Sequence, residues 1–107
     1  MAKFVLLYSG GGMADTEAQR AATLHAWGAW FGTLGSALVD GGNPFMPMAK
    51  KIAADGAVSD MSGAALSNNG YSILSADSLD AAVQLARGCP LLADGGQIAV
   101  HETLNVM

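Results

Sequence analysis

Two histidines are the side chains of this 107-residue chain best suited to proton transfer. His101 is predicted to lie in a strand in which Ile98 and Val100 share one face, so His101 points to the other face with Ala99. If the Ile98 face packs against helices, His101 is free on the opposite side of the sheet to act as a general base near pH 7. The alternative is a partly buried histidine held by hydrogen bonds.

His25 is predicted to lie on a helix, beside a stripe of very small side chains that includes Gly28 and Gly32. It is either an ordinary surface histidine or a group that lines a pocket beside these glycines. We keep both histidines as candidate catalytic residues.

The one cysteine, Cys89, lies between Gly88 and Pro90 in the stretch "LARGCPLLADGG". It continues the apolar stripe of a predicted helix, and Pro90 disfavours helical geometry at the residue before it. A reactive thiol needs a cation or a helix N-terminus nearby to lower its pKa, whereas this thiol follows the C-terminal end of a helix. We therefore interpret the stretch as a helix stop with a buried structural cysteine.

Four aromatic residues are candidates for ligand binding. Tyr8 and Tyr71 each lie at the end of a predicted strand, so they either place hydroxyl groups in one cavity or fill the core. Trp30 lies at the margin of a helical core stripe, where it either contacts a partner subunit or covers a pocket. Phe45 lies in the loop "GGNPFMPM", which exposes apolar side chains to a dimer interface or to an apolar ligand.

The chain shows no pattern for a metal or a cofactor. The two histidines are far apart in sequence, and the single thiol is predicted to be buried. The loop "SGGGMAD" lacks the third glycine of the dinucleotide-binding pattern and the lysine of the P-loop. We expect neither a metal site nor a cofactor.

Apolar periodicity and turn residues predict an α+β domain. We expect a long helix, capped by Asp15 or Thr16 and ending near Leu38, and a second helix over 77–88, capped by Asp77. The predicted strands are 3–8, a short one from Leu38, a hairpin with a type I′ turn at Asp55-Gly56, 70–76 and 96–106. This order is a split βαβ pattern, so we expect a ferredoxin-like antiparallel sheet with both helices on one face.

Three stripes of side chains predict how the helices pack. Two are apolar and should face the core, and the third consists of small residues that allow another segment to approach closely. The first apolar stripe is Leu24, Trp27, Phe31, Leu34 and Leu38, and the second is Leu79, Ala82, Val83, Ala86 and Cys89. The small-residue stripe is Ala21, Gly28, Gly32 and Gly35.

Composition indicates one globular domain over residues 1–107. Hydrophobic residues make up 51% of the chain and charged residues 13%, yet no apolar run is long enough to span a membrane. The net charge of −4 and the lack of a basic cluster argue against nucleic acid as a partner. One cysteine provides no disulfide framework, so we expect a cytoplasmic protein. Both faces of the strand 3–8 are apolar, which predicts a homodimer that covers the second face.

Three segments resemble the YCII-related family of the dimeric α+β barrel superfamily. They are "KFVLLYSGG", "HAWGAWFGTLGSALVDGGNPF" and "SADSLDAAVQLARGCPLLADGGQIAVHET". The resemblance implies that the sheets of two ferredoxin-like subunits pack face to face, with His101 facing the interior of the barrel. The Asp-Gly-Pro-Phe motif of many relatives is missing from "SDMSGAALSNNG", and His25 is the one residue that could match the first-helix histidine that some relatives carry.

Two hypotheses about function follow. The first is a homodimeric barrel without catalytic activity that binds a small, largely apolar molecule or serves as an assembly module. The second is a cofactor-independent lyase, isomerase or oxygenase acting on a small organic acid or aromatic lactone, as the resemblance implies. In that case His101 is the acid or base, and Tyr71 positions the substrate.

Overall fold

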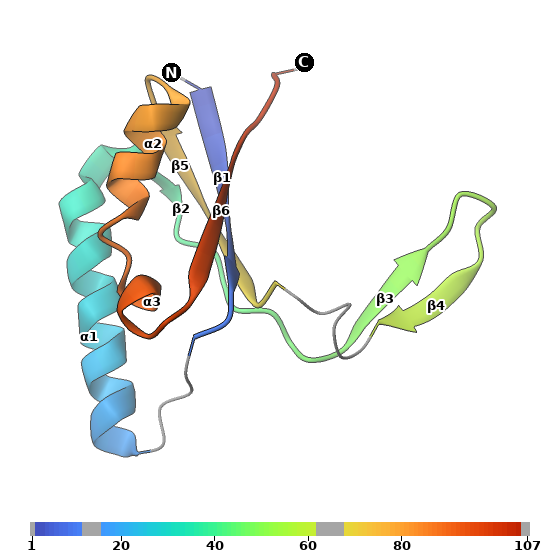
Figure 1. Cartoon of the computed structure of the whole chain (residues 1–107), viewed down its shortest axis with the longest axis horizontal. Coiled ribbons are helices and arrows are strands. Elements are labelled where there is room, and N and C mark those ends of the chain that lie inside the picture. The colour runs from blue at the N-terminus through green and yellow to red at the C-terminus, as the bar shows by residue number, and fades with distance from the viewer. Residues whose placement is uncertain (1, 12–15, 62–67, 106–107) are drawn as a thin grey trace.

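The residues that the structure describes build a four-stranded antiparallel sheet with helices on one face (Figure 1). They are residues 2–11, 16–61 and 68–105 of a computed structural model of the chain. In their order across the sheet, the strands are β2 (Leu38–Asp40), β5 (Gly70–Ala76), β1 (Ala2–Ser9) and β6 (Gln97–Glu102). The predicted α+β class is confirmed, and the arrangement is compatible with a ferredoxin-like fold.

Alternation along β1 separates the two faces of the sheet. Phe4, Leu6 and Tyr8 are buried on the helix side, while Val5 and Leu7 are half-buried on the other side. The prediction that both faces of this strand are apolar is therefore confirmed.

The side of the sheet opposite the helices is uncovered in the described part of the chain. Residues directly opposite each other on neighbouring strands point to the same side, and the register places six side chains in the middle of this side, between the pair Lys3 and Ser75 at one end and the pair Ser9 and Gln97 at the other. We call them the open face: Val5, Leu7, Tyr71, Ile73, Ala99 and His101. Ile98 and Val100, which alternate with Ala99 and His101 along β6, pack against the core under the helices, so the condition stated for an open-face His101 is met.

The long helix α1 (Glu17–Leu34) begins as expected and ends earlier than expected. Thr16 caps it: the Gln19 N–H donates to Thr16 Oγ1 at 3.1 Å, and the Thr16 N–H donates to Gln19 Oε1 at 3.3 Å. Asp15, the other predicted cap, lies outside the described residues. The helix was predicted to reach Leu38, but Gly35 has a φ of +54°, which ends the helix. A short 3₁₀ turn, η1 (Gly35–Ala37), then leads into β2.

The face that α1 buries is rotated from the predicted one. Trp30 and Leu34 are its buried residues, whereas Leu24 is 73% exposed. The Trp30 Nε1–H donates to the Leu85 backbone oxygen at 3.1 Å, which fixes the indole between the two helices. The prediction that Trp30 lies at the margin of the core stripe is therefore wrong.

The small-residue stripe of α1 does not serve a close approach within the chain. A Cβ added at Gly28, Gly32 or Gly35 would meet no atom within 4 Å. The expected tight packing against these glycines is therefore absent among the described residues.

The second helix, α2 (Leu79–Ala86), is capped by Ser78 and not by Asp77, because the Ala81 N–H donates to Ser78 Oγ at 3.1 Å. Ala82 and Ala86 are buried as predicted, but Leu79 is 44% exposed. The predicted helix stop is confirmed. Pro90 then takes the first position of a one-turn helix, α3 (Pro90–Ala93), for which its fixed φ is suited.

Residues 45–61 form an arm that extends away from the sheet and helices (Figure 1). Its strands, β3 (Ala49–Ile52) and β4 (Val58–Met61), pair only with each other. The radius of gyration is 15.4 Å, whereas a compact domain of this length has about 13 Å. An isolated two-stranded hairpin is marginally stable in water. We therefore expect contacts with another surface to stabilise the arm.

The turn of the arm contains Asp55-Gly56 as predicted, but it is longer than a type I′ turn. The Ala53 N–H donates to the Ala57 oxygen at 2.8 Å, and the Gly56 N–H donates to the Ala53 oxygen at 2.9 Å. These bonds enclose a three-residue loop in which Gly56 has a φ of +90°. This is the pattern of a type I turn followed by a left-handed glycine.

Candidate functional site

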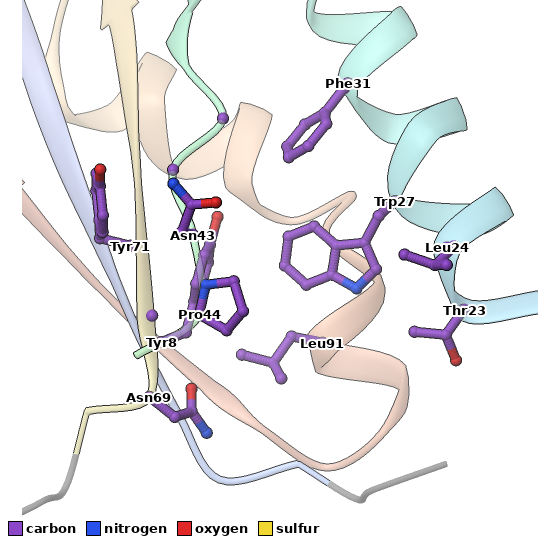
Figure 2. Close-up of a pocket in the computed structure, with 13 residues that line it drawn as sticks. Tyr8, Thr23, Leu24, Trp27, Phe31, Asn43, Pro44, Asn69, Tyr71 and Leu91 are labelled. Atoms are coloured by element: carbon purple, nitrogen blue, oxygen red, sulfur yellow. The ribbon is translucent and has the colours of Figure 1, made fainter. Parts of the chain in front are cut away.

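A pocket of about 350 Å³ lies between α1 and the root of the arm (Figure 2). One wall is α1, and the other consists of residues 41–44 and 69–71, which flank the arm in sequence. Leu91 and Tyr8 also line the pocket. A pocket of this size lies at the lower end of the range that binds small organic molecules.

The α1 wall is built from Thr23, Leu24, Trp27 and Phe31, which helical spacing places on one side of the helix. Figure 2 shows the rings of Trp27 and Phe31 directed from the helix toward the opposite wall. The two ring centroids lie 5.8 Å apart at an interplanar angle of 65°. Most of the residues that the sequence predicts as a core stripe therefore line a pocket.

The opposite wall depends on two glycines. Gly42 has a φ of +70°, and a Cβ there would overlap the backbone oxygen of Tyr71, so a side chain cannot be accommodated. A Cβ at Gly41 would lie 3.3 Å from the Phe31 ring. The Asp40 carboxylate fixes the loop by accepting a hydrogen bond from the Gly42 N–H at 2.8 Å.

The root of the arm completes this wall. Pro44 and Gly70 form an isolated bridge between the two chain segments that enter and leave the arm. The Phe45 N–H donates to the Asn69 oxygen at 2.8 Å, and the Asn69 N–H donates to the Tyr8 oxygen at 2.7 Å. The pocket wall is therefore held to β1 through the root of the arm.

Tyr8 supplies a ring to the pocket and keeps its hydroxyl in the core. The ring packs edge to face against Trp27, with centroids 5.3 Å apart and planes at 79°. The Tyr8 hydroxyl donates to Ser72 Oγ at 2.7 Å, and the Ser72 hydroxyl donates to the Gly41 oxygen at 2.7 Å. Burial raises the pKa of Tyr8 far above its ordinary value of 10.0. The hydroxyl therefore stays neutral and structural at physiological pH.

The polar groups of the pocket are neutral. The Asn69 Nδ2–H donates to the Gly10 oxygen at 2.8 Å, so one of the donor hydrogens of this amide is not available to a ligand. The Asn43 side chain is exposed and makes no hydrogen bond within the described part of the chain. Among the described lining residues none carries a charged side chain.

Both tyrosines are among the residues that line the pocket, but their hydroxyl groups do not share it, because the Tyr8 hydroxyl lies in the core and the register puts the Tyr71 side chain on the open face. Phe45 does not line the pocket, and its ring stacks on Tyr71, with centroids 5.9 Å apart and planes at 25°. Trp30 is placed differently, because it is buried in the core and bonded to Leu85. It contacts Trp27 edge to face at 5.6 Å and so supports the pocket from behind.

The two histidines are not brought together. His101 is exposed on the open face of the sheet, opposite Val5. His25 is exposed on α1, next to Leu24 in sequence, and does not line the pocket. The sheet lies between them, so they cannot form one acid–base pair within a single chain.

Cys89 has the environment of a structural thiol. It is 3% exposed and packs in the core with Leu6 and Trp30. Burial raises the pKa of Cys89 from 9.0 to about 11, which disfavours the reactive thiolate. The structure places this side chain as the sequence predicts.

Sequence reasoning missed Trp27, Leu91 and Asn43 as pocket residues. Helical spacing identifies the α1 wall, but the same spacing also fits a filled core. The other wall comes from three separate segments that no local pattern links. The signal that could have been used is the stretch "DGGNP", whose paired glycines and proline leave a loop with little side-chain volume.

The described part of the chain contains no cluster of three potential metal ligands, and none of its helices is long and apolar enough to cross a membrane. Comparison with protein family models, curated proteins and solved structures finds no match to the chain.

Proposed function

We propose that this chain is a small-molecule-binding protein of the YCII-related family, acting as a cytoplasmic homodimer with a split βαβ, ferredoxin-like subunit. In this proposal the pocket between α1 and the arm root holds a small, largely apolar molecule. The observation that carries the proposal is the aromatic wall of Trp27 and Phe31, which faces an open pocket of about 350 Å³. The strand order β2-β5-β1-β6, with α1 following β1 and α2 following β5, supports the split βαβ connectivity.

An apolar ligand suits this pocket because its walls expose ring and aliphatic surface to water. Removing such surface from water stabilises a complex by about 25 cal/mol per Å². The pocket is also largely pre-formed, since Gly42 and Asn69 are held by backbone hydrogen bonds. A ligand therefore does not have to order these walls when it binds.

Two uncovered apolar surfaces support a homodimer. The open face presents half-buried Val5, Leu7 and Ile73 without a covering layer in the described chain. The arm exposes Met48 and Ile52, which are 85% and 72% exposed. Apolar surface of this extent is typical of protein interfaces. In a face-to-face dimer the open face of one chain covers that of its partner.

The second candidate function is a cofactor-independent lyase, isomerase or oxygenase acting on a small organic acid or aromatic lactone. The observation that favours it is the register of the sheet, which puts His101 and Tyr71 on the same open face. In a dimeric barrel this face is the interior, where His101 would act as acid or base. A ligand that perturbs His101 and leaves Trp27 unchanged in NMR spectra would favour this function over the first.

Native mass spectrometry of the freshly purified protein tests the proposed function. We expect a dimer that releases a discrete small molecule on denaturation. The variant Thr23→Trp places a large ring in the pocket and should lose that molecule. Ala22→Trp is the matched control, because Ala22 is exposed on the same helix and does not line the pocket. A wild-type dimer that is empty, and stays unbound when small aromatic compounds are added, would instead indicate an assembly module.

A further inference from the structure

We infer that the pocket selects uncharged, flat aromatic molecules that carry a carbonyl, amide or hydroxyl group, and that it rejects carboxylates of the same shape. This inference rests on the proposed function and specifies its ligand. It also separates the pocket from the organic acids of the enzyme hypothesis. Three observations carry it: the charge of the walls, their aromatic rings and the polar side chain of Asn43.

The walls offer no charge to a bound anion. None of the described lining residues is cationic, so a carboxylate would lose its water shell without gaining a counter-charge. The nearest fixed charge in the loop has the wrong sign: the Asp40 carboxylate is bound to the Gly42 N–H, directly behind the wall. The chain as a whole has a net charge of −4, which adds to the repulsion.

The aromatic rings of the walls favour a flat molecule. At Gly41 the two walls are already in contact, since a Cβ there would be 3.3 Å from the Phe31 ring, so no ligand ring fits between them at that point. Gly42 presents bare backbone to the pocket, and the rings of Trp27 and Phe31 project from the other side (Figure 2). Aromatic rings bind other rings well in stacked or edge-to-face geometry. A planar ring therefore uses this space better than a bulky aliphatic group.

Asn43 is the polar group available to orient the ligand. The Tyr8 hydroxyl is already bonded to Ser72, and the Asn69 amide donates to Gly10. The Asn43 amide has no partner within the described residues and lies on the wall that faces Phe31 and Trp27 (Figure 2). An amide offers two donors and an acceptor, which match a neutral carbonyl, amide or hydroxyl group.

Three naphthalene probes of similar size, one neutral, one anionic and one cationic, test the inference. They are 2-naphthamide, 2-naphthoate and 2-(aminomethyl)naphthalene in its ammonium form, each titrated into the 107-residue chain at pH 7 by calorimetry. We expect 2-naphthamide to bind at least about tenfold more tightly than 2-naphthoate, because an unpaired charge is costly to desolvate. The ammonium probe should also bind more weakly, because no carboxylate lines the pocket among the described residues.

Two variants of the exposed Asn43 sharpen the test. Asn43→Ala should lower the affinity for 2-naphthamide about fivefold, because one hydrogen bond is lost. The affinity for unsubstituted naphthalene should not change. Asn43→Lys supplies the missing counter-charge and should reverse the preference toward 2-naphthoate. Circular dichroism confirms that each variant is folded.

The outcomes distinguish the inference from the proposal on which it rests. If wild-type protein binds neither naphthalene nor any probe, the proposed binding function is wrong and the inference falls with it. If the probes bind but 2-naphthoate or the ammonium form equals or exceeds 2-naphthamide, the pocket stands and its inferred preference is wrong.

Discussion

At the scale of single residues, the two tyrosines show how similar sequence signals lead to different roles. Both lie at strand ends and both are among the residues that line the pocket, but their hydroxyl groups do not meet in one cavity. Only Tyr8 has its hydroxyl bonded in the core, because alternation along β1 turns it toward the helices and onto Ser72. Strand alternation is visible in the sequence, whereas the partner of a buried hydroxyl, 64 positions away, is not.

Replacing each tyrosine with phenylalanine separates these roles. Tyr8→Phe should lower the free energy of unfolding by about 1 kcal/mol, since it removes one buried hydrogen bond. Tyr71→Phe should change it by less than about 0.5 kcal/mol, because Tyr71 is half-buried and no hydroxyl bond holds it among the described residues. Urea denaturation of both variants measures the difference, and equal losses would contradict the role given to Tyr8.

The buried Cys89 predicts a loss of stability in alkali. Its pKa is raised from 9.0 to about 11 by burial, so above the ordinary thiol pKa the unfolded chain loses this proton before the folded chain does. The unfolded state then binds fewer protons, and stability falls as pH rises from about 9 through about 11. Urea melts across this range should show the fall, and Cys89→Ala should reduce it. Tyr8, also raised, adds to the fall above about pH 10.

At the scale of elements, local patterns predict where strands lie better than which side of a helix is buried. β5 matches its predicted bounds because apolar alternation and its flanking residues are local signals. α1 carries large apolar residues on two adjacent faces, Trp27 with Phe31 and Trp30 with Leu34. Periodicity cannot choose between these faces, so the choice is made by Leu85 and Gly88, which contact Trp30.

Two glycine-to-alanine changes test this packing of α1 and α2. A Cβ at Gly88 would lie 3.0 Å from the buried Trp30 ring, so Gly88→Ala should destabilise the protein by about 1 to 2 kcal/mol. Gly28 is the matched control because a Cβ there would meet nothing within 4 Å. Gly28→Ala should stabilise α1 by about 0.5 to 1 kcal/mol. Thermal melts that show Gly88→Ala to be neutral would contradict the placement of Trp30.

At the scale of the whole molecule, the sequence predicts the α+β class. The pocket could not be predicted from the sequence. Its walls come from residues 23–31, 41–44, 69–71 and Leu91, which the fold brings together across the sheet and helices. The lone hairpin turn signal at Asp55-Gly56 identifies the arm. The arm extends away from the sheet because its strands do not pair with the other described strands. No local sequence pattern encodes this lack of pairing.

The proposed dimer predicts that a charge on the open face separates the subunits. Ile73 lies in the middle of this face, paired with Val5, so Ile73→Lys should convert a dimer into a monomer in sedimentation experiments. The control is Leu79→Lys, since Leu79 is exposed on α2 on the helix side, and this variant should remain dimeric. Wild-type protein that is monomeric at micromolar concentration would contradict the dimer itself.

The central claim is that a small aromatic molecule binds against Trp27. The chain has two tryptophans, and their indole N–H groups give separate NMR signals that report on two adjacent faces of α1, one lining the pocket and one buried in the core. On titration with 2-naphthamide, we expect the Trp27 signal to shift and saturate, while the Trp30 signal, held by Leu85 in the core, changes little. A titration that leaves Trp27 unmoved, or that shifts Trp30 alone, would contradict the account.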